Sequence, residues 1–516
     1  MGVADGISRK ARIAIIGAGP AGLSAAWFLK QHGFERVTVF EEQGRVGGLC
    51  NTLTEDGCSF DLGANYVTPS YRETLKLARE VGAARYRSRP WTAVRVPPRD
   101  AVEQATQPLP YLDLFDVVRE LRDRDGNIQR KVGLGAFVWA LLKYVWKRFR
   151  LRGALDGATL EHIHERPDLC VPFRTWLERE GLGDLRSLFE IPITLMGYGY
   201  LDHVAAPYAL RFMSLGMFIP MLLRQVPGLG PFFPWPQRFV FGFQRMWEAL
   251  SWRLDVRCNV KVRRITRSPD PADLHPIQID FEHPQRIFRA IRKDRDTLWF
   301  DYLIVACMRA GSLGHCDRSC KNPVLDVTPE ELDQFTKTST YHFCVTTLHA
   351  KPGFRPKRPV VCAIPFVDET TDRPWALVQL WGGKSDMLQC YTKLPEEELD
   401  EITGRSKDRS SDVLPGVVRL VRLLGGDVYP IEGFAREIAG DEKLARWESY
   451  MQWPYFSHVE VDQMRAGWFA DLERLQGRSR TFWVGGAASF EAVEPIVRYS
   501  KHLVERHFLG RAASHR

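Results

Sequence analysis

Three glycines near the start of the chain have the spacing of a site that binds the pyrophosphate of a dinucleotide. The segment GAGPAG, residues 17–22, follows the apolar run at 13–16 and precedes an apolar stretch long enough for a helix. In such a site Gly17 makes a tight turn and Gly19 lets the backbone approach the phosphates, while Gly22 lets the helix pack closely on the strand. The N-terminus of that helix supplies N–H donors and a positive dipole end.

An acid and a second pair of glycines strengthen this interpretation. Glu41 ends the next apolar run, VTVFEE, about 20 residues after the first glycines, where a carboxylate can accept hydrogen bonds from ribose hydroxyls. Gly47 and Gly48 follow in the loop EEQGRVGG at 41–48. The strand, the helix, the acid and the second diglycine together predict dinucleotide binding, which a glycine motif alone would not.

The loop at 41–48 also indicates which dinucleotide is bound, because a nicotinamide domain usually continues directly to its third strand. The arrangement resembles the flavin-containing amine oxidoreductase superfamily, in which this loop wraps the pyrophosphate and ribityl chain of FAD. Three further segments resemble motifs of the same family. They are DVRCNVKVRRI at 255–265, whose Val262 would contact the adenine, DYLIVA at 301–306, and TFWVGG at 481–486.

The resemblance implies a set of FAD contacts. The implied contacts are Gly17, Gly19, Pro20, Ala21, Gly22, Glu41, Arg45, Gly47, Gly48, Leu49, Gly63, Ala64, Val262, Gly485, Gly486, Glu494 and Ile496. One departure puts a contact in doubt, since members of the family commonly carry an acid where this chain has Gly486. No Cys-Tyr pair of the kind that attaches flavin in some amine oxidases is visible at 487–489, so we expect non-covalent binding.

The composition agrees with a large flavoenzyme. A chain of 516 residues that is 45% hydrophobic can bury at least two cores, so two or three domains are expected. The net charge of +8 comes from scattered clusters such as 147–150 and 289–295. Scattered clusters argue against dedicated nucleic-acid binding and favour an anionic substrate or peripheral membrane contact, with solvated basic faces as the plainer alternative.

The cysteines and the N-terminus predict a cytoplasmic protein without a metal. The ten cysteines are spread thinly, as buried thiols in a reducing compartment are. Only His315, Cys316 and Cys320 cluster, and no second ligand pair has the spacing of a zinc site. Residues 1–12 lack the apolar core of a signal peptide, and no run reaches the roughly 18 apolar residues of a spanning helix.

The succession of elements predicts an α/β fold with a discontinuous Rossmann-type FAD-binding domain and an α+β substrate domain, as in amine oxidases. We assign 1–95, 236–315 and 445–516 to the FAD-binding domain. The substrate domain then comprises a helical, aromatic-rich part at 96–235 and a part at 316–444 with strand-like segments.

The stretch at 208–221 is apolar nearly all round and rich in methionine and aromatic residues. It fits a core helix, and it also fits a helix that lines an internal tunnel, since methionine packs adaptably around flexible ligands. In the second case the candidate substrate contacts are Phe212, Met217, Phe218 and Met221. An apolar tunnel leading to a flavin would imply a lipophilic substrate.

Three segments resemble bacterial polyunsaturated fatty acid isomerases: GYGYLDHVAAPY at 197–208, YFSHV at 455–459 and RAGWF at 465–469. The resemblance runs, with gaps, from about 10 to 508. It implies that oxidised FAD removes a hydride from the bis-allylic carbon of a 1,4-diene and returns it from flavin N5 to the far end of the allylic cation. The residues implied to form an aromatic wall beside that cation are Tyr198, Tyr200, Tyr455 and Phe456.

A fatty acid also needs a carboxylate anchor, for which a guanidinium group is suited. The isomerases use an arginine shortly after the segment that matches 69–71 here. The corresponding stretch is RYRSRPW at 85–91, in which Arg89 is the first candidate and Arg87 the second.

Two other functions remain open. The first is an FAD-dependent oxidase or desaturase that passes electrons from a lipophilic natural product or an amine to O2. An amine oxidase needs a lysine near the flavin, and Lys337 is the one lysine that can be placed there, although it follows an acidic helix start and is expected on the surface. The second is a flavin-bound scaffold without turnover. We favour the isomerase, and the sequence leaves the exact substrate and the oligomeric state undetermined.

Overall fold

The computed structural model covers the whole chain and describes most of it. The described residues are 6–87, 91–95, 108–122, 128–225, 228–229, 232–233, 236–270, 273–287, 290–306, 324–351, 354, 360–364, 376–381, 384–394, 417–418, 420–427 and 447–510.

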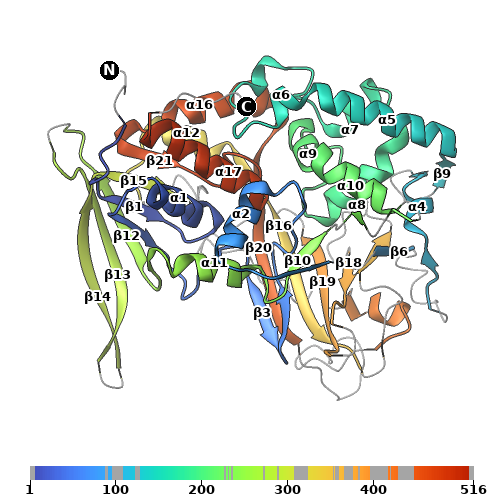
Figure 1. Cartoon of the computed structure of the whole chain (residues 1–516), viewed down its shortest axis with the longest axis horizontal. Helices are drawn as coiled ribbons and strands as arrows, with labels where there is room; N and C mark the ends of the chain where they lie inside the picture. The colour runs from blue at the N-terminus through green and yellow to red at the C-terminus, as the bar shows by residue number, and fades with distance from the viewer. Residues whose placement is uncertain are drawn as a thin grey trace.

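A parallel sheet of five strands brings together segments from the start, the middle and the end of the chain (Figure 1). Its central strand is apolar and its first three side chains are fully buried, as a strand covered on both faces requires. The predicted Rossmann-type architecture is confirmed. In order across the sheet the strands are β11 (Asp255–Arg257), β2 (Val37–Phe40), β1 (Ile13–Ile16), β15 (Tyr302–Val305) and β21 (Thr481–Trp483).

Helices α1 (Pro20–Gln31) and α17 (Val493–Leu503) pack against each other beside this sheet. The hydroxyl of Ser500 donates to the carbonyl of Ala21 at 3.2 Å. The C-terminal helix is therefore fixed against the glycine turn that precedes α1.

The segment at 255–265 forms two strands in two different sheets. After β11 the chain turns at 258–260 and continues as β12 (Lys261–Arg267), which pairs with the hairpin of β13 (Ile277–Ile287) and β14 (Ala290–Phe300). This hairpin extends away from the rest of the molecule (Figure 1).

A mixed sheet of seven strands forms the second large layer. Two of its strands, β6 and β20, come from 1–95 and 445–516, which we assigned to the FAD-binding domain. The predicted division into domains stays a prediction, and its limits at 95 and 445 do not follow the two sheets. In order the strands are β20 (Trp447–Val459), β16 (Thr338–His349), β19 (Met387–Leu394), β18 (Ala376–Val378), β17 (Val360–Ile364), β6 (Trp91–Arg95) and β7 (Tyr111–Leu112).

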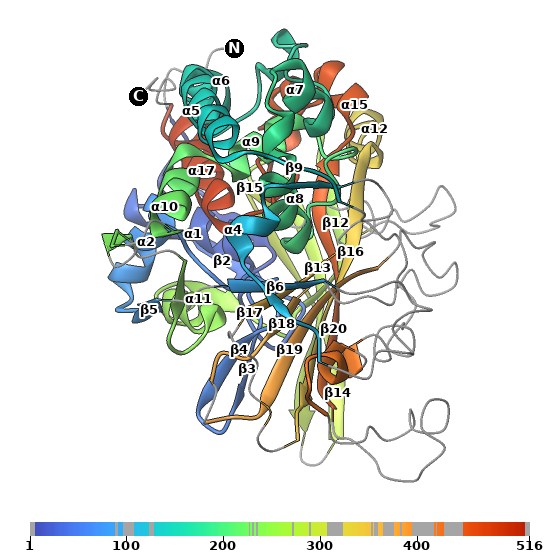
Figure 2. The ribbon, with the colours of Figure 1, turned by 90° about the vertical axis from the view of Figure 1, so that its right-hand side faces the viewer.

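Helices gather above the seven-stranded sheet in both views (Figures 1 and 2). They come from the aromatic-rich segment for which helices were predicted. They are α4 (Leu114–Val117), α5 (Leu134–Arg150), α6 (Arg152–Leu155), α7 (Phe173–Arg179), α8 (Arg186–Leu195), α9 (Ala206–Phe212) and α10 (Leu215–Gln225).

Short elements connect these layers. The strand pairs are β3 (Thr52–Glu55) with β4 (Cys58–Asp61), β5 (Arg85–Arg87) with β10 (Gln237–Phe239), and β8 (Glu120–Arg122) with β9 (Ile128–Lys131). The remaining α-helices are α2 (Arg72–Glu80), α11 (Phe243–Ser251), α12 (Pro329–Thr336), α15 (Val461–Arg465) and α16 (Trp468–Leu475). Single turns of other helix types lie at Ile163–Glu165, Gly183–Leu185, Arg478–Arg480 and Val504–Phe508.

No single helix in the described part of the chain is long and apolar enough to cross a bilayer. Helices α9 and α10 meet the length and composition criteria only when taken together, and the pair is bent by 55°.

Candidate active site

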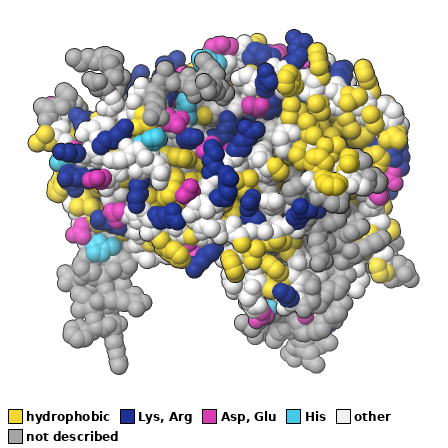
Figure 3. Space-filling view, in the orientation of Figure 1, with side chains coloured by type: hydrophobic (Ala, Val, Ile, Leu, Met, Phe, Trp, Pro, Cys, Tyr) yellow, Lys and Arg dark blue, Asp and Glu magenta, His cyan; other side chains and the backbone are white. Residues whose placement is uncertain are grey.

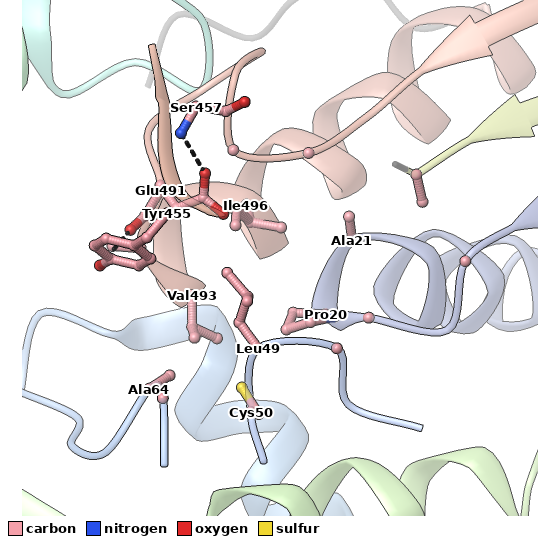
Figure 4. Close-up of a pocket in the computed structure, with 18 of the residues that line it drawn as sticks. Pro20, Ala21, Leu49, Cys50, Ala64, Tyr455, Ser457, Glu491, Val493 and Ile496 are labelled. Atoms are coloured by element: carbon pink, nitrogen blue, oxygen red, sulfur yellow. Dashed lines mark hydrogen bonds between the residues drawn. The ribbon is translucent and has the colours of Figure 1, made fainter. Parts of the chain in front are cut away.

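A cavity of about 800 Å³ lies at the carboxyl ends of the Rossmann-type strands. Ile16, Phe40, Ala306 and Gly485, which end or follow four of these strands, all line it. Ligands of open α/β sheets bind at this edge, and the volume lies in the upper part of the range for small-molecule sites, about 300–1,000 Å³. Figure 4 shows the start of α1 and the start of α17 facing the same space.

The two glycine turns form one side of the cavity. A Cβ atom on Gly22 would lie 2.0 Å from the carbonyl oxygen of Gly17, so the helix meets the turn as closely as predicted. A Cβ atom on Gly48 would lie 3.1 Å from the Cα of Gly19, so the second turn sits against the first. The carboxylate of Glu41 accepts hydrogen bonds from the backbone N–H groups of Ala18 (2.8 Å) and Gln43 (2.9 Å). The turns are therefore fixed in a shape that leaves room for phosphates.

Glu491 was not predicted, and it fills the position of the acid that Gly486 lacks. A Cβ atom on Gly486 would lie 2.6 Å from Oε2 of Glu491 and 2.7 Å from its Cδ. Oε2 also accepts a hydrogen bond from the N–H of Ser457 at 2.8 Å (Figure 4). The cavity thus keeps a carboxylate at this point, supplied by a residue five positions later. The sequence signal for Glu491 is the glycine at 486, which implies that another residue supplies the carboxylate.

Tyr198 and Tyr455 form an aromatic wall on the cavity. Both line it, their ring centroids lie 5.7 Å apart, and both hydroxyls donate to the carbonyl oxygen of Glu491, at 3.0 and 3.3 Å. Burial raises the pKa of each phenol well above 10. Both side chains are therefore neutral at physiological pH, and they place two aromatic rings on the cavity.

The other two predicted wall residues do not line the cavity. Phe456 is fully buried and packs behind Tyr198, with ring centroids 5.1 Å apart. Tyr200 is partly buried against the main core. The aromatic wall therefore contains two of the four predicted residues.

Arg238, in β10, lines the cavity and was also not predicted. Its side chain is only 5% exposed, and Nε and Nη1 have no hydrogen-bond partner within the described part of the chain. β10 pairs with β5 so that Arg238 lies opposite Tyr86. This register brings a buried cation to the cavity from a segment without a motif.

One of the two predicted carboxylate anchors lies within the described residues. Arg87 is exposed on β5, opposite Gln237, and does not line the cavity, which corrects that prediction. Arg89 lies outside the described residues.

Comparisons with known proteins agree with the dinucleotide site. Residues 15–81 match the family described as NAD(P)-binding Rossmann-like domain. The chain is 44% identical to mitochondrial protoporphyrinogen oxidase of Nicotiana tabacum over 78 residues, which are 15% of each chain. Over 70 residues it is 36% identical to polyenoic fatty acid isomerase of Ptilota filicina, or 14% of each chain. The chain thus spans about 15% of the length of these curated relatives.

Solved structures extend the similarity to the whole chain. A CLA-producing fatty acid isomerase from P. acnes has a TM-score of 0.70 and 22% identity, covering 97% of this chain and 100% of that chain. Cyclohexylamine oxidase from Brevibacterium oxydans has a TM-score of 0.57 and 13% identity, with 97% and 100% covered. The chain therefore has the fold of these two proteins. Since an isomerase and an oxidase both have it, the fold alone does not select the reaction.

Most residues predicted to contact FAD line the cavity of this amine oxidase-like fold. They are Gly17, Gly19, Pro20, Ala21, Glu41, Gly48, Leu49, Gly63, Ala64, Val262, Gly485, Gly486 and Ile496. They include both glycine turns and the N-terminus of α1, so the described residues fit a flavin dinucleotide.

Four predicted contacts support the cavity from outside it. Gly22 packs on Gly17, as described above. Gly47 donates its N–H to the carbonyl of Ala18 at 2.8 Å, and Arg45 donates from Nη1 to the carbonyl of Gly48 at 3.0 Å. These bonds hold the second turn against the first.

Glu494 is the fourth. Its carboxylate accepts hydrogen bonds from the N–H groups of Glu73 (3.0 Å) and Thr74 (2.9 Å) and from the Thr74 hydroxyl (2.8 Å). It therefore caps α2, because carboxylates stabilise the unpaired N–H groups at a helix N-terminus.

The predicted tunnel residues on α9 and α10 do not line the cavity either. Phe212 is buried against Tyr198, and Phe218 packs on Tyr144 and stacks with Phe189. Met217 is buried and Met221 packs against the same core. The interpretation of this stretch as core, left open by the sequence, describes it better.

Lys337 is on the surface, as expected. It is the C-cap of α12, directly after the helix, and its Nζ pairs with Asp333 at 2.5 Å. Among the described residues the lysine that lines the cavity is Lys261, next to Val262 and far along the chain from the aromatic wall. Within the same residues no group of three or more potential metal ligands occurs, and His315, Cys316 and Cys320 fall outside them.

Proposed function

We propose that the protein is an FAD-dependent isomerase that moves a double bond of a polyunsaturated fatty acid into conjugation. The observation that carries the proposal is the aromatic wall of Tyr198 and Tyr455 in the same cavity as the dinucleotide turns. The structural similarity to a fatty acid isomerase over nearly the whole chain supports it.

Particular residues would hold FAD. The glycine turns and the N-terminus of α1 suit the pyrophosphate. Glu41 suits the ribose, because a carboxylate has about four acceptor positions and only two are used by backbone N–H groups. Glu491 suits the ribityl region, and the backbone near Val262 suits the adenine. We expect non-covalent binding. When bound, FAD would supply the group that accepts a hydride from carbon and returns it.

The chain's own residues would orient the diene and protect the cation. In the proposed reaction a hydride would leave the bis-allylic carbon with the electron pair of its C–H bond, and the cation left behind would be delocalised over both double bonds. The hydride then forms a C–H bond at the far end, so the composition of the substrate is unchanged. The faces of Tyr198 and Tyr455 can stabilise the positive charge. Burial raises the pKa of both phenols, so they stay protonated and are weak nucleophiles toward the cation.

An O2-dependent oxidase or desaturase of a lipophilic compound or amine is the second candidate, favoured by the fold it shares with cyclohexylamine oxidase. A protonated amine is disfavoured by the buried cation of Arg238, since like charges repel strongly at low dielectric.

The first test mixes the yellow protein anaerobically with linoleate and records the diene and flavin absorption together. We expect a conjugated-diene band that grows over many turnovers while the flavin ends oxidised, with stearate giving no band. Flavin that bleaches and recovers only in air would overturn the isomerase proposal and support the oxidase.

A further inference from the structure

Arg238 is a buried cation with incomplete hydrogen bonding. An unpaired polar group in a low-dielectric site costs free energy, and a charged one costs more. Native structures therefore rarely leave a buried guanidinium nitrogen without an acceptor. Two of the three nitrogens of Arg238 lack one within the described part of the chain.

The groups around Arg238 do not supply the missing anion. Asp61 is the nearby acid, but its Oδ1 accepts from the Thr52 hydroxyl (2.7 Å) and the N–H of Phe243 (2.8 Å). It forms no ion pair with Arg238 within 4.0 Å in the described structure. The other groups that act on this region are phenols, Tyr66, Tyr86 and Tyr391. Asp61 therefore acts on Arg238 only through a longer-range charge interaction, and the phenols beside the arginine bring no negative charge.

We propose that Arg238 binds the carboxylate of the substrate. This inference rests on the proposed function for the identity of the acid, and it goes further in naming the anchor. Tyr391 and Asn65 also line the cavity, and the Asn65 amide donates to the Tyr391 hydroxyl at 3.3 Å. The polar end of the cavity therefore consists of these three residues, and the aromatic wall is left for the hydrocarbon chain.

The substrate class follows from this anchor. A long-chain carboxylate completes the hydrogen bonding of Arg238, whereas a methyl ester or an alcohol brings no charge. A hydrogen bond to a charged group is worth about 10- to 100-fold in affinity. The wild-type protein is therefore expected to prefer a fatty acid over its methyl ester by about that factor.

The test measures binding and turnover separately. Palmitate, which has no diene, is titrated into the flavin-loaded protein while the flavin spectrum is followed. Arg238→Met should weaken palmitate binding about 10- to 100-fold and raise KM for linoleate with little change in kcat. Arg238→Lys should recover part of the binding. Arg87→Met, on the neighbouring strand, is the control and should bind as wild type does.

Three results would overturn the anchor. They are unchanged palmitate binding by Arg238→Met, equal affinity of the wild type for palmitate and its methyl ester, and loss of flavin rather than of palmitate from Arg238→Met. Palmitate binding that depends on Arg238 without any diene from linoleate would support the anchor and refute the isomerase. The ester comparison needs no variant, so it holds even if Arg238→Met does not fold.

A separate observation concerns the outer surface. Helix α5 is apolar on two opposite faces. Its buried face, with Phe137 and Tyr144, packs on the core. Its outer face presents large apolar side chains that are 45–69% exposed, most of them three or four residues apart. They are Leu134, Val138, Trp139, Leu142, Trp146 and Phe149. Figure 3 shows a broad apolar patch over this part of the molecule. A patch of this kind marks an interaction surface.

The charges around this patch are basic. Residues 126–155 contain no Asp or Glu and seven Lys and Arg. Four of the seven, Arg130, Lys131, Lys147 and the buried Arg148, pair with acids of other segments. The basic side chains left for a partner are Lys143, Arg150 and Arg152. Arg150 lies over the Trp146 ring at 4.9 Å and Arg152 over the Phe149 ring at 4.3 Å. Neither arginine forms an ion pair with a described residue.

Helix α5 is also tied to the helices beside the cavity. Tyr144 donates from its hydroxyl to the carbonyl of Met213 at 2.7 Å, and Arg148 donates from Nε to the carbonyl of Leu210 at 2.9 Å. Phe212, between these carbonyls, packs on Tyr198 of the aromatic wall. The exposed face is thus one helix layer away from the cavity wall.

We infer that the exposed face of α5 docks on an anionic lipid bilayer. A surface helix with tryptophan, phenylalanine and leucine on one face and arginine and lysine beside it lies in the headgroup region of such membranes. The apolar side chains would enter the acyl boundary while the basic side chains meet lipid phosphates. This inference does not depend on the reaction.

Vesicle flotation tests the docking surface with the full-length, flavin-loaded protein. Wild type should float with vesicles of phosphatidylcholine and phosphatidylglycerol and bind less to phosphatidylcholine alone. The double variant Trp139→Ser, Trp146→Ser should lose at least about tenfold in binding, because each tryptophan buries a large apolar area. Trp252→Ser is the matched control, since Trp252 and Trp139 are both 69% exposed and Trp252 belongs to the end of α11 rather than to α5.

Equal vesicle binding by wild type and the double variant would overturn the docking surface, as would an equal loss in Trp252→Ser. A wild-type dimer by light scattering that the double variant converts to a monomer, without vesicle binding, would assign the face to a second copy instead.

Discussion

Replacing Gly22 with alanine is expected to prevent the protein from retaining flavin. The added Cβ atom would lie 2.0 Å from the carbonyl oxygen of Gly17 and 3.2 Å from Cγ2 of Ile15. The first neighbour is backbone, so it cannot rotate away, and either α1 or the glycine turn must move. Overpacking of this kind costs about 1–3 kcal/mol and often more. Since the turn itself shapes the phosphate site, we expect at least about a 100-fold rise in the Kd for FAD.

The measurement is the ratio of flavin to protein after gel filtration, together with titration of the apoprotein with FAD. Gly135→Ala is the control, since a Cβ atom there meets nothing within 4 Å and alanine is favoured in a helix. Flavin content in Gly22→Ala equal to that of the control would contradict the role of close packing. A circular dichroism spectrum like that of wild type would separate loss of the site from loss of the fold.

The cofactor turns could be predicted from the sequence because their signals are local. Three signals lie within 29 consecutive residues: the apolar run at 13–16, the glycine spacing at 17–22 and the acid Glu41. Each of them can be interpreted without knowing which distant residues it contacts. The division of 255–265 between two sheets could not be predicted, since it depends on hydrogen-bond partners that are distant in the sequence. There the N–H groups of Asn259 and Val260 donate to carbonyls of the loop after β2.

The substrate-binding residues were harder to predict, because a helix buried in the core and a helix that lines a cavity have the same amino-acid composition. Phe212 and Phe218 are as apolar as any tunnel residue, and only packing shows that Tyr144, Phe189 and Tyr198 already fill the space around them. The same limit hid Arg238. Its position depends on a β10–β5 pairing that joins residues about 150 positions apart, and no motif surrounds it.

The role of the Glu491 carboxylate can be tested by moving the acid from position 491 to position 486. Glu491 stands where the acid at 486 would begin, and Gly486 has a backbone conformation open to other residues, since its φ lies outside the left-handed region. If this carboxylate binds the ribityl region, Glu491→Ala should raise the Kd for FAD about 10- to 100-fold, the range for a hydrogen bond to a charged group.

The double variant Gly486→Asp, Glu491→Ala carries the stronger prediction. In it the alanine leaves the space that the aspartate side chain needs, so FAD binding should return to within about threefold of wild type. Gly486→Asp alone should bind worse than wild type, because its Cβ would lie 2.6 Å from Glu491 Oε2 and two carboxylates would share one site. The four proteins form a cycle in which two harmful changes compensate each other.

The alternative role for Glu491 is structural, through the hydrogen bond from the N–H of Ser457. In that case an aspartate at 486 gains nothing, the losses add, and the double variant binds FAD worst of all. Thermal unfolding of the four apoproteins distinguishes the two roles further. Loss of a structural carboxylate lowers the Tm of the apoprotein. Loss of a carboxylate that serves the cofactor mainly reduces the increase in Tm that FAD produces.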